Sequence, residues 1–204
     1  MILVIAEQRG GTLNRATWET IAAAQQLASG QPMTVVVPGS GKSGVAAELA
    51  TAEAKEVVTV DHATLDLYTP DGYTAALQQV IAELAPTMVL LPHTYQTRDF
   101  APQLAARMDR ALITDVVAIK NAGGDVVFVR PMFQGKLTAD VVPQGPVPHF
   151  ITCQIGAFRA DKAAKGASAA PVRSLTITAD ATAIRQTPEP PFQEAKQAVD
   201  LSQA

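Results

Sequence analysis

The sequence predicts an α/β fold in which helices flank a mainly parallel sheet, with antiparallel strands added in the second half. Two observations support this prediction. Short apolar runs typical of buried strands alternate with longer amphipathic segments up to about residue 113. Beyond that point short strand-like runs follow one another with glycine-rich turns and without helices between them. Strands joined through helices pair in parallel, whereas strands joined by tight turns pair antiparallel.

Four strand-and-helix units account for the first half of the chain. The expected strands are 2–6, 33–37, 56–60 and 88–91, and the helices that follow them are expected over 14–30, 44–52, 73–84 and 98–109. Thr97 is expected to cap the last of these helices. Right-handed crossovers would place the helices against the sheet, as in Rossmann-like folds and in the adenine nucleotide alpha hydrolase-like fold.

The second half is expected to contribute antiparallel strands. Residues 116–120 and 126–131 form a predicted hairpin across a glycine-rich turn. Further short strands are expected at 136–142, 150–155 and 174–177, as antiparallel additions to the parallel sheet or as a small sheet at its edge. The predicted domain therefore covers residues 1–184. Residues 185–204 are expected to form a linker, because its prolines prevent a helix at its start.

Composition and charge exclude several classes of function. The chain has 204 residues, of which 48% are hydrophobic, and a formal net charge of −3. Because Lys and Arg do not cluster, we expect no binding to nucleic acid. No apolar run approaches the ~20 residues that a membrane span needs, so no membrane insertion is expected. The lack of a signal-peptide pattern before Ile2 and the single Cys153 indicate a reducing compartment, expected to be the bacterial cytoplasm.

A glycine-rich loop follows the second expected strand. Gly39, Gly41 and Gly44 have the spacing of a dinucleotide-binding loop, in which backbone N–H groups approach a pyrophosphate at a helix N-terminus. The loop follows the second strand instead of the first, and Pro38 stiffens it, which favours a simple turn. If the loop did bind a nucleotide, the chain would be a free-standing nucleotide-binding protein of the universal-stress type.

The titratable side chains show no spacing typical of a catalytic or metal site. His62, His93 and His149 lie far apart, so zinc is not expected, and His93 is expected to be a hydrogen-bonded residue at a strand end. Cys153 lacks positive neighbours in sequence and is expected to be a buried thiol. We therefore expect no enzyme activity from this chain.

Residues 94–102, Thr-Tyr-Gln-Thr-Arg-Asp-Phe-Ala-Pro, resemble the signature loop of the electron-transfer flavoprotein alpha subunit. Segments 3–7, 111–115, 130–136 and 152–159 resemble the same family in the same order. The resemblance implies an amino-terminal scaffold domain whose linker leads to an FAD-binding domain that this sequence lacks. It also implies an electron carrier in which FAD belongs to the full-length heterodimer, with none expected in this chain alone.

The resemblance further implies partners and contact residues. An electron-transfer flavoprotein beta subunit would pair with this domain, and the whole protein would carry electrons from acyl-CoA dehydrogenases or similar flavoenzymes, as in fatty acid beta-oxidation, to a quinone reductase. Arg130 is expected to approach a flavin held by the beta subunit. The residues expected at the interface are Tyr95, Gln96, Arg98, Phe133, Gln134 and Phe158. An exposed apolar patch is predicted around Tyr95, Phe133 and Phe158.

Overall fold

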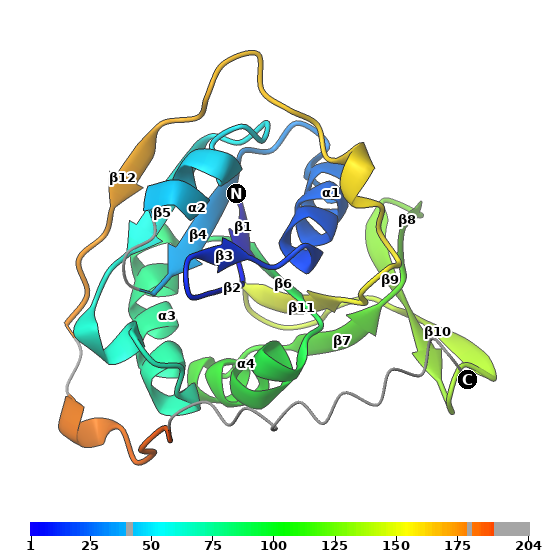
Figure 1. Cartoon of the computed structure of the whole chain (residues 1–204). Coiled ribbons are helices and arrows are strands. Elements are labelled where there is room, and N and C mark those ends of the chain that lie inside the picture. The colour runs from blue at the N-terminus through cyan, green and yellow to red at the C-terminus, as the bar shows by residue number, and fades with distance from the viewer. Residues whose placement is uncertain (40–42, 179–180, 190–204) are drawn as a thin grey trace, which may run out of the picture.

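The computed structural model describes residues 1–39, 43–178 and 181–189, and a seven-stranded sheet forms its centre (Figure 1). The strand order is β12-β5-β4-β1-β6-β11-β7, and neighbouring strands pair in parallel. These strands are β1 (Ile2–Ile5), β4 (Met33–Pro38), β5 (Glu56–Val60), β6 (Met88–Pro92), β7 (Leu112–Val116), β11 (His149–Cys153) and β12 (Val172–Ser174). The predicted α/β class with a mainly parallel sheet is confirmed.

Helices cover both faces of this sheet (Figure 1). On one face lie α1 (Ala16–Ala28) and α2 (Ser43–Leu49), and on the other lie α3 (Pro70–Leu84) and α4 (Tyr95–Met108). Successive residues of β4 point to opposite faces, so Val35 joins the first core layer and Val36 joins the second. Burial on both faces explains why the strands are continuous apolar runs in the sequence.

The start of α4 differs from the prediction. Thr94 is the capping residue, and its hydroxyl accepts a hydrogen bond from the backbone N–H of Thr97 at 3.1 Å. The helix therefore begins at Tyr95, and the predicted cap at Thr97 is wrong by about one turn. The two threonines have the same capping chemistry, and the sequence alone does not distinguish them.

An antiparallel three-stranded sheet, here called the arm, extends beyond β7 (Figure 1). It consists of β8 (Ala118–Ala122), β9 (Asp125–Met132) and β10 (Leu137–Val141), in the order β10-β9-β8. This confirms the antiparallel strands added in the second half. The arm ends in a tight turn at which Phe133, Gln134 and Gly135 all have positive φ, of 50°, 58° and 81°.

Two later strands contradict the antiparallel interpretation. β11 lies in parallel between β6 and β7, and β12 pairs in parallel with β5. Residues 150–155 and 174–177 are therefore not antiparallel additions, and the second of these strands ends at Ser174. The chain makes its crossover to β11 through the arm instead of through a helix, so the usual sequence signal for a parallel strand is missing.

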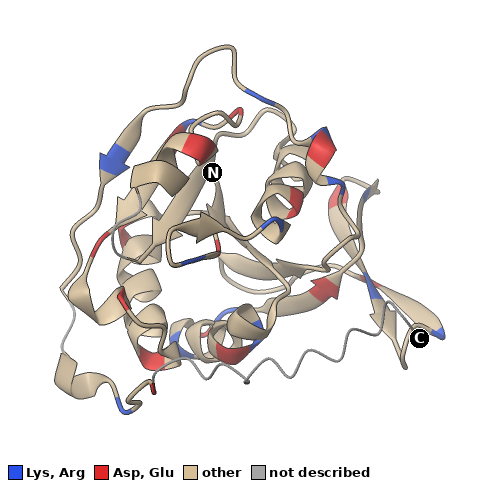
Figure 2. Cartoon of the chain, viewed as in Figure 1, with Lys and Arg blue, Asp and Glu red and all other residues tan. Residues whose placement is uncertain are grey.

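The remaining elements are short. A two-stranded ribbon and three 3₁₀ turns complete the described residues: β2 (Gln8–Arg9), β3 (Thr12–Leu13), η1 (Ala63–Leu65), η2 (Ala160–Lys162) and η3 (Ala181–Ala183). Charged residues of both signs are scattered over the elements (Figure 2). Within the described part of the chain no helix is both long enough and apolar enough to cross a membrane.

Candidate functional site

A pocket of about 290 Å³ lies beside the carboxyl ends of β6, β11 and β7. Polar side chains from several elements line it: His93 follows β6, Arg98 comes from α4, Asp115 from β7, Arg130 from β9 and Thr152 from β11. The carboxyl edge of a parallel sheet is the usual place for ligands in open α/β folds. The fold thus brings together residues that are far apart in the sequence.

Thr152 organises one wall of this pocket. Its hydroxyl accepts the backbone N–H of Asp115 at 3.0 Å and lies 2.8 Å from Nδ1 of His93. The two contacts fix the position of the Thr152 hydroxyl between His93 and the backbone of Asp115. The other ring nitrogen of His93, Nε2, lies 3.8 Å from Oδ1 of Asp115.

The electrostatic surroundings keep His93 neutral. Burial lowers the pKa of its imidazole, and the charges of Arg98 and Arg130 lower it further, while Asp115 opposes them. A histidine with a lowered pKa is uncharged at neutral pH. The predicted role of His93, a hydrogen-bonded residue at a strand end, is confirmed.

Two guanidinium groups give the pocket its binding chemistry. The Arg98 guanidinium carbon lies 5.6 Å from the ring centroid of Tyr95. Nε of Arg130 is buried and has no hydrogen-bond partner among the described residues. A buried donor without a partner is unfavourable unless another group supplies an acceptor. The arrangement can therefore hold and orient a group that carries acceptor atoms.

The predicted interface residues fall into different environments. Tyr95 is 89% exposed and Phe133 is 69% exposed, on α4 and at the tip of the arm. Arg98 and Gln134 are exposed as well, and Gln96 is half-buried. Phe158 is only 7% exposed and belongs to the core layer that contains α1. It cannot form part of an exposed patch in the folded chain, so that part of the prediction is wrong.

Two polar residues that line the pocket, Asp115 and Thr152, are not among the site residues expected from the sequence. Asp115 and Thr152 carry no motif that would identify them without the fold. A signal was nevertheless present, because Thr114 and Asp115 interrupt an apolar run at the end of β7. Asp115 also has a φ of 64°, a left-handed conformation that is uncommon for residues other than glycine. Cys153, by contrast, is the buried thiol that was expected, and burial raises its pKa to about 12.

The glycine-rich loop shows no ligand-binding geometry in its described part. Gly39 has a φ of 126° and donates its N–H to the carbonyl of Val60 at 3.0 Å. Gly44 lies in the seven-residue helix α2, and Gly41 lies outside the described residues. The pocket described above and a second one of about 570 Å³ are lined by other parts of the chain.

The position where a nucleotide would be expected in this topology is bridged by side chains. The strand order reverses between β1 and β6, and such switch points are common ligand sites. Here the Thr94 hydroxyl donates to Oε2 of Glu7, while Nδ2 of Asn14 donates to Oε1 at 2.7 Å. These contacts join the two halves of the sheet at the point of reversal.

We accordingly expect ATP, AMP and NAD to leave the melting temperature of the chain unchanged. A nucleotide that binds specifically and is present at 100 times its dissociation constant would stabilise the folded state by about 2.7 kcal/mol, which a thermal shift measurement detects easily. A nucleotide-dependent shift that Gly41→Val abolishes would contradict this expectation and identify the loop as the binding site.

Comparison with known proteins decides the family. A model of the electron transfer flavoprotein domain matches residues 2–180. The chain belongs to the electron transfer flavoprotein family. It is 34% identical to the electron transfer flavoprotein subunit alpha of Bacillus subtilis over 146 residues, which cover 72% of this chain and 45% of the relative. The alpha subunit of Syntrophomonas wolfei is 32% identical over 157 residues, which cover 75% of this chain and 49% of the relative.

These relatives confirm the resemblance to the alpha subunit and support an electron transfer flavoprotein role. The chain spans about half the length of the curated relatives it matches. A third relative, 28% identical over 162 residues, covers 78% of this chain and 39% of its own length. It is the lactate dehydrogenase (NAD(+),ferredoxin) subunit LctC of Acetobacterium woodii. The family consists of electron-carrying flavoproteins, and this relative is named as a subunit of a dehydrogenase.

Proposed function

We propose that this chain is the scaffold domain of an electron transfer flavoprotein alpha subunit and that it pairs with a beta subunit in an FAD-dependent carrier. The observation that carries the proposal is the family match over residues 2–180. The exposed aromatic rings of Tyr95 and Phe133 support it, because aromatic residues are enriched at protein–protein interfaces.

The carrier would take electrons from acyl-CoA dehydrogenases or similar flavoenzymes and deliver them to a quinone reductase, in the cytoplasm of a bacterium. In this arrangement the chain contributes no catalytic residue. No three His, Cys, Asp or Glu side chains of the described residues group together as a metal site.

Arg130 is the residue that we propose to approach a flavin of the beta subunit. Its guanidinium is a fork of donors, and an isoalloxazine ring presents carbonyl oxygens and ring nitrogens as acceptors. The unpartnered Nε supports this assignment, since the described residues leave the guanidinium with a donor that still needs an acceptor. We further propose that residues 1–184 form the domain and that residues 185–204 act as a linker towards an FAD-binding domain.

Co-expression with a beta subunit tests the proposal. The chain should co-purify with the beta subunit as a stable complex, and the chain alone should show no flavin absorbance after soaking with excess FAD. The few contacts that a scaffold domain can make with FAD cannot offset the free-energy cost of the translational and rotational freedom lost on binding, which is about 4–15 kcal/mol. Failure to capture a beta subunit would refute the pairing. A stoichiometric yellow chain would instead show that FAD binds within these residues.

A further inference from the structure

The last part of the described chain returns across the domain. We call residues 172–178 and 181–188 the return segment. It begins with β12, which pairs with β5, and the N–H of Leu175 continues this pairing by donating to the carbonyl of Thr59 at 2.8 Å. Leu175 and Ile177 are buried in the core layer that contains α3 and α4. Thr178 then forms two hydrogen bonds with the side chain of Gln79 on α3, at 2.6 and 2.9 Å.

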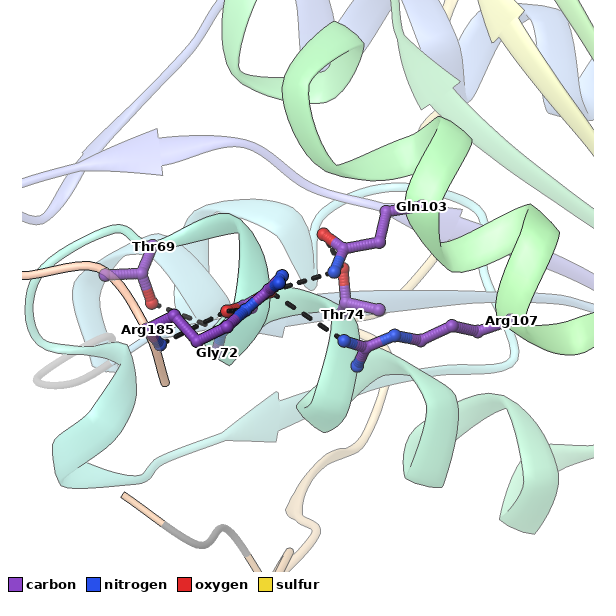
Figure 3. Close-up of polar contacts among 7 residues, drawn as sticks. Thr69, Gly72, Thr74, Gln103, Arg107 and Arg185 are labelled. Atoms are coloured by element: carbon purple, nitrogen blue, oxygen red, sulfur yellow. Dashed lines mark hydrogen bonds and ion pairs between the residues drawn. The ribbon is translucent and has the colours of Figure 1, made fainter. Parts of the chain in front are cut away.

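A buried carboxylate holds the far end of the return segment (Figure 3). Asp71 lies in the first turn of α3 and is only 2% exposed. Nε and Nη2 of Arg185 donate to its two oxygens at 2.8 and 2.9 Å, and the backbone N–H of Arg185 donates to Oδ2 at 3.2 Å. A paired fork of this kind fixes both the distance and the orientation of the two groups.

Two residues of α4 complete the surroundings of Asp71. Gln103 donates through Nε2 to Oδ1 at 2.8 Å, and Nη2 of Arg107 lies 3.8 Å from the same oxygen (Figure 3). Hydrogen bonds from Arg185 and Gln103 hold the pKa of the Asp71 carboxyl well below its usual range, against the opposing effect of burial. The carboxylate stays charged inside the protein because these donors replace its hydration.

We infer that Asp71 and Arg185 are positioning residues that fix where the end of the return segment lies on the domain. Arg185 fastens the return segment to the start of α3. The role in positioning a following domain rests on the proposed function, whereas the anchoring itself is a property of this chain.

A pocket beside the contact between Arg185 and Asp71 shows what the contact keeps in place. The second pocket, of about 570 Å³, lies between the return segment and the connection from η1 to α3. Ile184 and Pro188 form one wall of it, and Leu67 and Thr69 form the other. Release of Arg185 would remove the first wall and expose apolar surface that the anchored segment now covers.

Hydrogen exchange measured by mass spectrometry tests this inference with a matched pair of variants. Arg185→Gln removes the guanidinium through which the return segment binds the carboxylate of Asp71. Arg107→Gln removes a second guanidinium near the same carboxylate, and this one comes from α4. In Arg185→Gln the amides of residues 181–187 should exchange about tenfold faster or more, because the charge-assisted hydrogen bonds that hold this stretch against Asp71 are lost. Arg107→Gln should leave that exchange at the wild-type rate.

The outcome separates anchoring from general stability. The Leu175 amide, which is bonded to Thr59, should keep its protection in both variants. Asp71→Asn keeps the shape of the side chain and should free residues 181–187 as Arg185→Gln does. Unchanged exchange in Arg185→Gln, or an equal increase in Arg107→Gln, would overturn the inference. Wild-type chain that fails to capture a beta subunit would instead count against the proposed function.

Discussion

Replacement of Phe150 by alanine should lower the free energy of unfolding by about 3–5 kcal/mol, the cost of removing a large buried aromatic side chain. Phe150 is fully buried in β11, where it lies opposite Val89 of β6 and Leu112 of β7. It packs into the core layer that contains α3 and α4. The loss would arise from the transfer of the ring to water and from the cavity that it leaves behind.

Denaturant unfolding followed by circular dichroism measures this effect. Leu137→Ala is the control, because Leu137 is an exposed residue of the arm and such changes usually fall within about 0.5 kcal/mol of wild type. A Phe150 variant no less stable than the Leu137 variant would mean that β11 does not hold the sheet together in the way that the register indicates.

Most of the central sheet could be predicted because each of these strands and the helix that follows it show their own pattern within a short stretch of sequence. Apolar runs and the amphipathic segments between them identify β1, β4, β5 and β6 and the helices that follow them. The position of β11 is different. It depends on the arm, which carries the chain away from the sheet and back to a place between β6 and β7. No pattern within His149–Cys153 specifies which strands will be its neighbours.

The candidate site shows the same division. His93 could be named from the sequence because it follows a predicted strand, whereas Arg98 and Arg130 were named through the resemblance to the family. The contact of His93 with Thr152 could not be predicted, because it joins residues separated by a long stretch of chain. Exposure is equally non-local: Phe158 was expected at the surface, but the chain after β11 folds back against α1, where the N–H of Gly156 donates to Oε2 of Glu19 at 2.6 Å.

Binding to the beta subunit should depend strongly on Phe133. Replacement of this ring by alanine should cost about 2 kcal/mol or more of binding free energy, roughly a thirtyfold loss of affinity, as for central aromatic residues of other interfaces. Phe133 is 69% exposed at the tip of the arm, and its backbone has a φ of 50°. The turn thus presents an apolar ring to solvent in a conformation that is unfavourable for most residues.

The measurement is a titration of the beta subunit with wild-type chain and two variants. Leu67→Ala is the matched control, since Leu67 is also an exposed apolar residue but lies in the connection between η1 and α3, outside the proposed interface. The Leu67→Ala variant should bind the beta subunit with the affinity of the wild-type chain. Both variants should unfold at the wild-type temperature, because the side chains that they lose make little contact with the core. If Phe133→Ala bound as tightly as Leu67→Ala, the tip of the arm would not be part of the interface, and the contact would have to be sought nearer to Tyr95.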